Sequence, residues 1–89
     1  MASWTIKWRD SALKELKKVD KYNQRQITQY LKSRVKTDDD PRRFGKALGG
    51  DKAGLWRYRV GDYRIICKIE DEELIVLVVT VGHRRNVYG

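Results

Sequence analysis

The chain has 89 residues, of which 40% are apolar and 36% are charged, and its formal net charge is +8. This length allows one small domain, which we expect to span residues 1–89, and the composition excludes a disordered chain. The excess of positive charge favours a polyanionic partner, such as RNA, DNA, an anionic membrane surface or an acidic protein segment.

The first part of the chain predicts a strand followed by two helices. Apolar and polar side chains alternate over residues 4–8, which is typical of a half-buried strand. Asp10 and Ser11 offer capping groups for a helix over residues 12–19. After a two-residue break, the helical spacing of apolar side chains returns over residues 22–36, so we expect a helical hairpin.

The middle of the chain predicts a helix exit and a connector. Residues 37–41 contain three successive aspartates and then a proline, which ends the helix. Carboxylates that bind a metal converge from separate positions, so we interpret this run as a solvated exit and expect neither a metal nor a cofactor. Residues 42–54 are rich in glycine but lack the spacing of a phosphate-binding loop, which indicates turns.

The last part of the chain predicts three strands, over residues 55–60, 63–69 and 74–81. The run 74–79 is apolar on both faces, which indicates a central strand that is covered on both sides and flanked by the first strand. The order β-α-α-β-β-β predicts an α+β fold, in which a small, mostly antiparallel four-stranded sheet carries the two-helix hairpin on one face.

The hairpin at Gly61 and Asp62 brings three arginines together. A two-residue loop places Arg59 opposite Arg64. Because side chains alternate between the two faces of a sheet, Arg57 shares this face, and the aromatic residues of the same strands face the core. Like charges that lie opposite each other destabilise a sheet, so this cluster indicates a binding site for an anion.

The segment after the last strand is expected to join this cluster. A two-residue turn at Asp71 and Glu72 would place residue 79 opposite Arg64, and the chain would then emerge beside the arginines. The following residues are candidates for a catalytic or RNA-binding role there: Arg57, Arg59, Arg64, His83, Arg84, Arg85 and Tyr88.

These residue types suit RNA. Arginine binds phosphate oxygens in bidentate fashion, tyrosine stacks on bases, and histidine titrates near neutral pH. The 2′-hydroxyl of RNA is a built-in nucleophile, so its cleavage needs alignment, charge stabilisation and proton transfer, without a metal. A structural role stays open for His83, as an ordinary polar residue, and for Tyr88, as a tail residue.

Three segments together resemble the RelE toxins of bacterial type II toxin–antitoxin systems, in the RelE/ParE superfamily: Leu48-Gly49-Gly50, Leu55–Ile66 and Val81–Tyr88. The resemblance covers nearly the whole chain. It implies a cytoplasmic, metal-independent endoribonuclease that cuts mRNA in the A site of the 70S ribosome and thereby inhibits translation. It also implies a cognate acidic, RelB-like antitoxin. The sequence has no apolar run of the ~18 residues that a membrane span needs, so we expect no membrane partner.

The resemblance assigns roles to single residues. Arg57 and Arg59 match two basic residues around the scissile phosphate, Arg64 and Arg84 match phosphate-stabilising arginines, and Tyr88 matches a C-terminal tyrosine. His83 lies where related toxins carry histidine or lysine.

One departure from the family concerns proton transfer. The best-known RelE toxins have lysines at the positions of Arg57 and Arg59, and a guanidinium is no general base near neutrality. His83 is then the first candidate for proton transfer and Tyr88 the second, with positioning and charge stabilisation alone as the alternative.

Two other functions stay open. A ParE-like toxin that inhibits DNA gyrase would have the same fold, because fold does not determine function. A basic module that binds RNA without cleaving it would share the charge.

Overall fold

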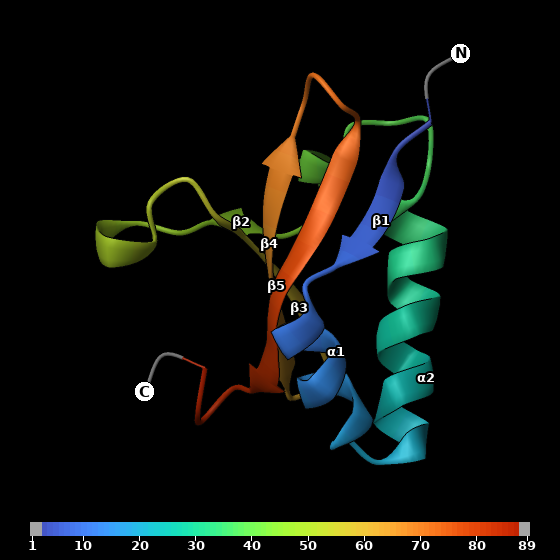
Figure 1. Ribbon diagram of the computed structural model, residues 1–89, viewed down its shortest axis with the longest axis vertical. Coiled ribbons are helices and arrows are strands. Elements are labelled where there is room, and N and C mark those ends of the chain that lie inside the picture. The colour runs from blue at the N-terminus through green and yellow to red at the C-terminus, as the bar shows by residue number, and fades with distance from the viewer. Residues whose placement is uncertain (1–2, 88–89) are drawn as a thin grey trace.

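The computed structural model describes residues 3–87, which form a five-stranded sheet with two helices on one face (Figure 1). In chain order, the elements are β1 (Thr5–Trp8), α1 (Asp10–Lys17), α2 (Lys21–Tyr30), the π-helical turn η1 (Leu31–Val35), the 3-10 turn η2 (Pro41–Arg43), β2 (Lys46–Ala47), the 3-10 turn η3 (Gly50–Lys52), β3 (Trp56–Val60), β4 (Tyr63–Glu70) and β5 (Ile75–His83). No helix in residues 3–87 has the length and apolar character that crossing a membrane requires.

The strands lie in the order β1-β5-β4-β3-β2, with β1 parallel to β5 and the other pairs antiparallel. The predicted α+β class and helical hairpin are confirmed, but the sheet has five strands instead of four. The unpredicted strand, β2, has only two residues, which is too few for an alternating pattern.

The predicted place of β5 inside the sheet is confirmed, since it lies between β1 and β4. The helices, however, cover only one of its faces in the described part of the chain (Figure 1). On the other face Leu77 is half-buried and pairs with Lys7 on β1 and Lys68 on β4. The prediction of a strand covered on both sides is therefore wrong for the described residues.

The hydrophobic core lies between the helices and the sheet. Ile27, Leu31 and Val35 of the second helical segment are buried against apolar residues of β3, β4 and β5. Cys67 is buried, as expected of a core residue, and burial raises the pKa of its thiol. Tyr58 is completely buried on the helix-covered face, which confirms the predicted alternation along β3.

The helices begin and end differently from the prediction. Arg9 is the N-cap of α1 and makes no side-chain capping bond, so the predicted cap by Asp10 or Ser11 is wrong. Asp10 lies in the first turn, where a negative charge interacts favourably with the helix dipole. The second helix is capped by Asp20, and beyond Tyr30 it continues as the π-helical turn η1 instead of an α-helix.

The hairpin between β4 and β5 has a different register from the predicted one. Glu70 pairs with Ile75, so the loop has four residues, and its last residue, Leu74, has a φ of 54°. A β-bulge at Ile66/Cys67 adds one further residue to β5. Arg64 consequently pairs with Gly82, three residues beyond the predicted position 79.

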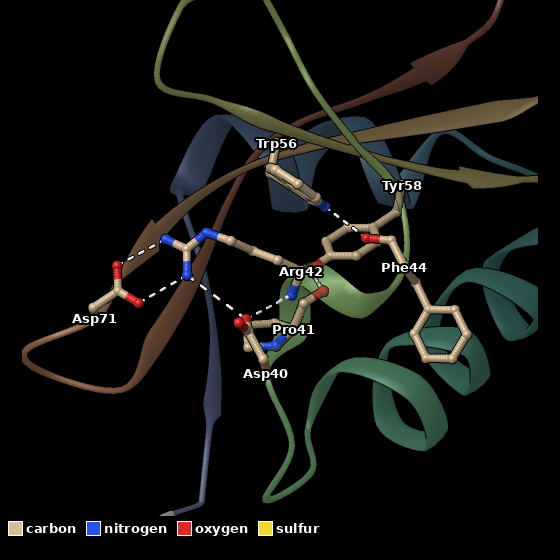
Figure 2. Close-up of polar contacts among 7 residues, drawn as sticks. All are labelled: Asp40, Pro41, Arg42, Phe44, Trp56, Tyr58 and Asp71. Atoms are coloured by element: carbon tan, nitrogen blue, oxygen red, sulfur yellow. Dashed lines mark hydrogen bonds and ion pairs between the residues drawn. The ribbon is translucent and has the colours of Figure 1, made fainter.

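Three side-chain contacts hold residues 41–44, in the connector between the helices and β3, against the sheet and its β4–β5 loop (Figure 2). Arg42 forms a bidentate pair with Asp71 at 2.8 and 2.7 Å, and this pair lowers the pKa of the Asp71 carboxyl. The Trp56 Nε1–H donates to the carbonyl of Phe44 at 2.6 Å, and the Tyr58 hydroxyl donates to that of Pro41 at 2.7 Å. The last two contacts fix residues 41–44 beside β3.

Candidate functional site

The face of the sheet that the helices leave open carries the three predicted arginines, which we call the arginine cluster (Arg57, Arg59 and Arg64). Arg59 pairs with Arg64, and Arg57 pairs with Ile66, as the hairpin predicted. Two guanidiniums thus lie opposite each other on neighbouring strands. This arrangement is unfavourable without an anion between or above them.

Arg64 is held in one orientation. Its side chain is buried, with 9% exposed, and its Nη1 donates to the carbonyls of Gly61 and Tyr63, both at 3.0 Å. The two-residue loop supplies one of these carbonyls because Gly61 adopts a positive φ of 58°, which glycine tolerates. The turn that sets the register therefore also orients this guanidinium.

The other two arginines of the cluster are more accessible. Arg59 is exposed, and no carboxylate in residues 3–87 lies within ion-pair distance of it. Arg57 is half-buried. The cluster thus combines the oriented guanidinium of Arg64 with the exposed one of Arg59, which has room to meet a phosphate.

The segment after β5 lies beside the cluster, as predicted. The Arg84 N–H donates to the carbonyl of Asp62 at 2.7 Å, and its Nε lies 3.7 Å from the Asp62 carboxylate. Gly82 pairs with Arg64, and a Cβ added there would come within 2.6 Å of the Val87 side chain. Val87 therefore lies over Gly82 on the arginine side of the sheet. Tyr88, the next residue, lies outside the described residues.

His83 lies on the other face. It pairs with Tyr63, and the two rings meet edge to face with their centroids 5.6 Å apart, in a hollow that Glu15 of α1 also lines. Its Nδ1 accepts a hydrogen bond from the Arg85 N–H at 3.2 Å, and the Arg85 side chain is exposed. The register thus separates His83 from the arginine cluster, with which the sequence had grouped it.

One cation of this face escaped the sequence analysis. Lys46 of β2 pairs with Arg57, so it lies on the same side of the sheet. Only recognition of the two-residue strand β2 could have revealed it. Among the described residues, the positions in register with the arginine cluster are Lys46, Ile66, Gly82 and the arginines themselves.

This arrangement is suited to binding a phosphodiester and stabilising negative charge on it. Guanidiniums supply charge-assisted, bidentate hydrogen bonds to phosphate oxygens. None of the described side chains in register with the cluster is an acid or base that titrates near neutrality.

Comparisons with known proteins find toxins of toxin–antitoxin systems. Residues 6–88 match the family described as ParE toxin of the type II toxin–antitoxin system parDE. Among curated proteins, the chain is 39% identical over 49 residues to toxin RelG of Mycobacterium tuberculosis, an alignment that covers 55% of this chain and 56% of RelG. It is 37% identical over 84 residues to a RelE-like toxin protein of Escherichia coli, covering 93% of this chain and 85% of that protein.

A solved structure shares the fold closely. The toxin–antitoxin complex RelBE2 of M. tuberculosis contains a chain that superposes with a TM-score of 0.85 and 27% sequence identity, covering 97% of both chains.

Proposed function

Since the chain belongs to the RelE/ParE family of toxins from type II toxin–antitoxin systems, we propose that it is a ribosome-dependent endonuclease that cuts mRNA in the A site and so inhibits translation. The observation that supports this proposal most is the oriented guanidinium of Arg64 opposite the exposed Arg59. Such a pair matches the charge that develops on a phosphodiester during cleavage.

In the proposed reaction, the 2′-oxygen of one nucleotide attacks the adjacent phosphorus. The 2′-O–P bond forms and the P–O5′ bond breaks, which leaves a 2′,3′-cyclic phosphate and a free 5′-hydroxyl. The 2′-hydroxyl loses its proton to water or to a group of the ribosome, and the 5′-oxygen gains one. Arg64 stabilises the charge on the phosphate oxygens, and Arg57, Arg59 and Arg84 bind phosphate groups of the RNA. Arg85 and Tyr88 are proposed to contact RNA.

Partners follow from the same proposal. The site is basic, with Arg59 and Arg84 exposed, and the similar M. tuberculosis structure is a toxin–antitoxin complex. We therefore expect an acidic, RelB-like antitoxin that folds on this chain and neutralises it. The proposed targets, mRNA and the 70S ribosome, would place the toxin in the cytoplasm.

A cleavage assay tests the proposal. The purified protein is incubated with mRNA, with and without programmed ribosomes, and the RNA ends are mapped. We expect cuts at the A-site codon, with 2′,3′-cyclic phosphate ends, only when ribosomes are present. Intact mRNA in both reactions would contradict the proposal, and salt-sensitive RNA binding without cleavage would indicate a non-catalytic module.

A ParE-like inhibitor of DNA gyrase is the second candidate, and the description of the matched family favours it. A supercoiling assay separates the two functions. Inhibition of gyrase by the protein, together with intact mRNA, would establish this alternative.

Replacing His83 with glutamine is expected to leave the cleavage rate and its pH profile close to those of the wild type. The imidazole lies on the opposite face from the arginine cluster, beside Tyr63. Loss of a general acid or base would instead lower the rate by about 10²–10⁴-fold. Single-turnover cleavage between pH 5.5 and pH 9 measures both quantities. A loss of that size, with a flattened pH profile, would assign proton transfer to His83.

A further inference from the structure

Lys46 continues the row of positive charges beyond the arginine cluster. Its pairing partner is Arg57, so β2 and β3 place two cations opposite each other. This pair lies two residues along β3 from the pair Arg59–Arg64. Lys46 is exposed and has no ion-pair partner among residues 3–87. Two successive cross-strand pairs of like charge are unfavourable for the free sheet.

Contacts of the two preceding residues, Phe44 and Gly45, hold Lys46 beside Arg57. The preceding residue, Gly45, has a φ of +81°, and a Cβ there would overlap the carbonyl oxygen of Arg57 and lie 2.7 Å from the Trp56 Nε1. That same Nε1 donates to the carbonyl of Phe44 at 2.6 Å (Figure 2). Close packing on one side and a hydrogen bond on the other thus anchor the start of β2 against β3.

A second lysine on this face provides a contrast. Lys68 of β4 lies two residues beyond Ile66, so an apolar side chain separates it from the arginine cluster. Its Nζ lies 3.8 Å from the Glu70 carboxylate, which offsets its charge. Of these two lysines, only Lys46 has no carboxylate within ion-pair distance among residues 3–87, so the positive charge of this face continues from the cluster toward β2.

We propose that Lys46 binds a backbone phosphate of the RNA next to the scissile one, so that the strand passes from Arg64 across β3 to the β2 edge. This inference rests on the proposed cleavage of RNA. From Arg59, which pairs with Arg64, to Lys46 the backbone positions lie two residues along and one strand across, which is roughly 8 Å. The long side chains of arginine and lysine can cover such a step from one phosphate to the next. Lys46 would act by charge on substrate binding, since an ammonium is a compact donor to phosphate.

The alternative is that Lys46 only protects the sheet. Lysines on edge strands discourage pairing with other chains, and β2 is an edge strand. A protective lysine would leave the affinity for RNA unchanged.

The test compares Lys46→Gln with the matched control Lys68→Gln. Binding is measured over a range of salt with a single-stranded RNA that carries a 2′-deoxy group at the scissile nucleotide, and cleavage is measured on programmed ribosomes. Lys46→Gln is expected to raise the Kd and the KM about threefold to tenfold and to reduce the salt slope of log K by about 0.7–1. The kcat should stay unchanged, Lys46→Arg should restore binding, and Lys68→Gln should behave as the wild type.

Equal affinities and salt slopes for the wild type, Lys46→Gln and Lys68→Gln would overturn this inference while leaving the proposed function intact. Equal losses in both variants would also overturn it, because they would report only the net charge of the face. A wild-type protein that neither binds nor cleaves RNA would instead overturn the proposed function, and this inference with it.

Discussion

Replacing Arg64 with alanine is expected to lower the rate of RNA cleavage by about 10²–10³-fold, the loss typical of one preorganised donor to a developing charge. Arg64 is the one member of the arginine cluster that is both buried and held by two backbone carbonyls at 3.0 Å. In the proposed reaction, a guanidinium held in this way needs no reorganisation as charge develops on the phosphate. Single-turnover cleavage on programmed ribosomes measures the rate.

Two controls separate catalysis from folding. Arg25→Ala removes an exposed arginine of α2 and should leave the rate unchanged. Arg64→Lys keeps the charge but loses the bidentate fork, so it should recover only part of the rate. Because Arg64 also supports the Gly61 turn, thermal unfolding of each variant must be compared. An Arg64→Ala protein that is folded and cleaves like the wild type would refute the assignment.

Replacing Tyr58 with alanine is expected to lower the free energy of unfolding by about 3–5 kcal/mol, as for other large aromatic residues removed from a core. Tyr58 is completely buried, and its ring packs 6.0 Å from that of Tyr30. A small domain has about 5–15 kcal/mol of stability in total, so this loss is a large share of it. Urea unfolding followed by tryptophan fluorescence measures the change.

Tyr58→Phe is the matched variant for the hydroxyl alone. The hydroxyl donates to the carbonyl of Pro41 at 2.7 Å, and burial raises its pKa, so it stays protonated as a donor. Its loss should cost about 0.5–1.5 kcal/mol. If Tyr58→Ala lost no more stability than Tyr58→Phe, the ring would not be a major part of the core.

The hairpin between β3 and β4 could be predicted from the sequence because its loop is short. Gly61 and Asp62 leave only one register, so the partners of Arg57, Arg59 and Arg64 followed from counting. The side of the sheet on which these arginines lie followed from the alternation of apolar residues.

The last hairpin could not be predicted in the same way. Leucine rarely adopts a positive φ, so nothing at Leu74 indicates a four-residue loop. The two extra loop residues shift β5 by an even number, so the same side chains of β5 would still face the arginines. The single bulge residue shifts it by one more, so from the bulge at Ile66/Cys67 to the end of β5 each side chain lies on the opposite face from the predicted one. His83 therefore changes face while Arg84 stays beside Asp62. A sequence carries no local signal for a bulge in a continuous apolar run.

The parallel pairing of β1 with β5 joins segments that are synthesised far apart in time. Thr5 pairs with Ile75, so some 70 further residues must be made before the strand exists with which β1 pairs among residues 3–87. Contacts of such long sequence separation form late and slow the folding of a small domain. The strand that completes the sheet also carries the chain to Arg84. The sheet and the segment that carries Arg84 are thus both incomplete on the nascent chain until β5 has been made.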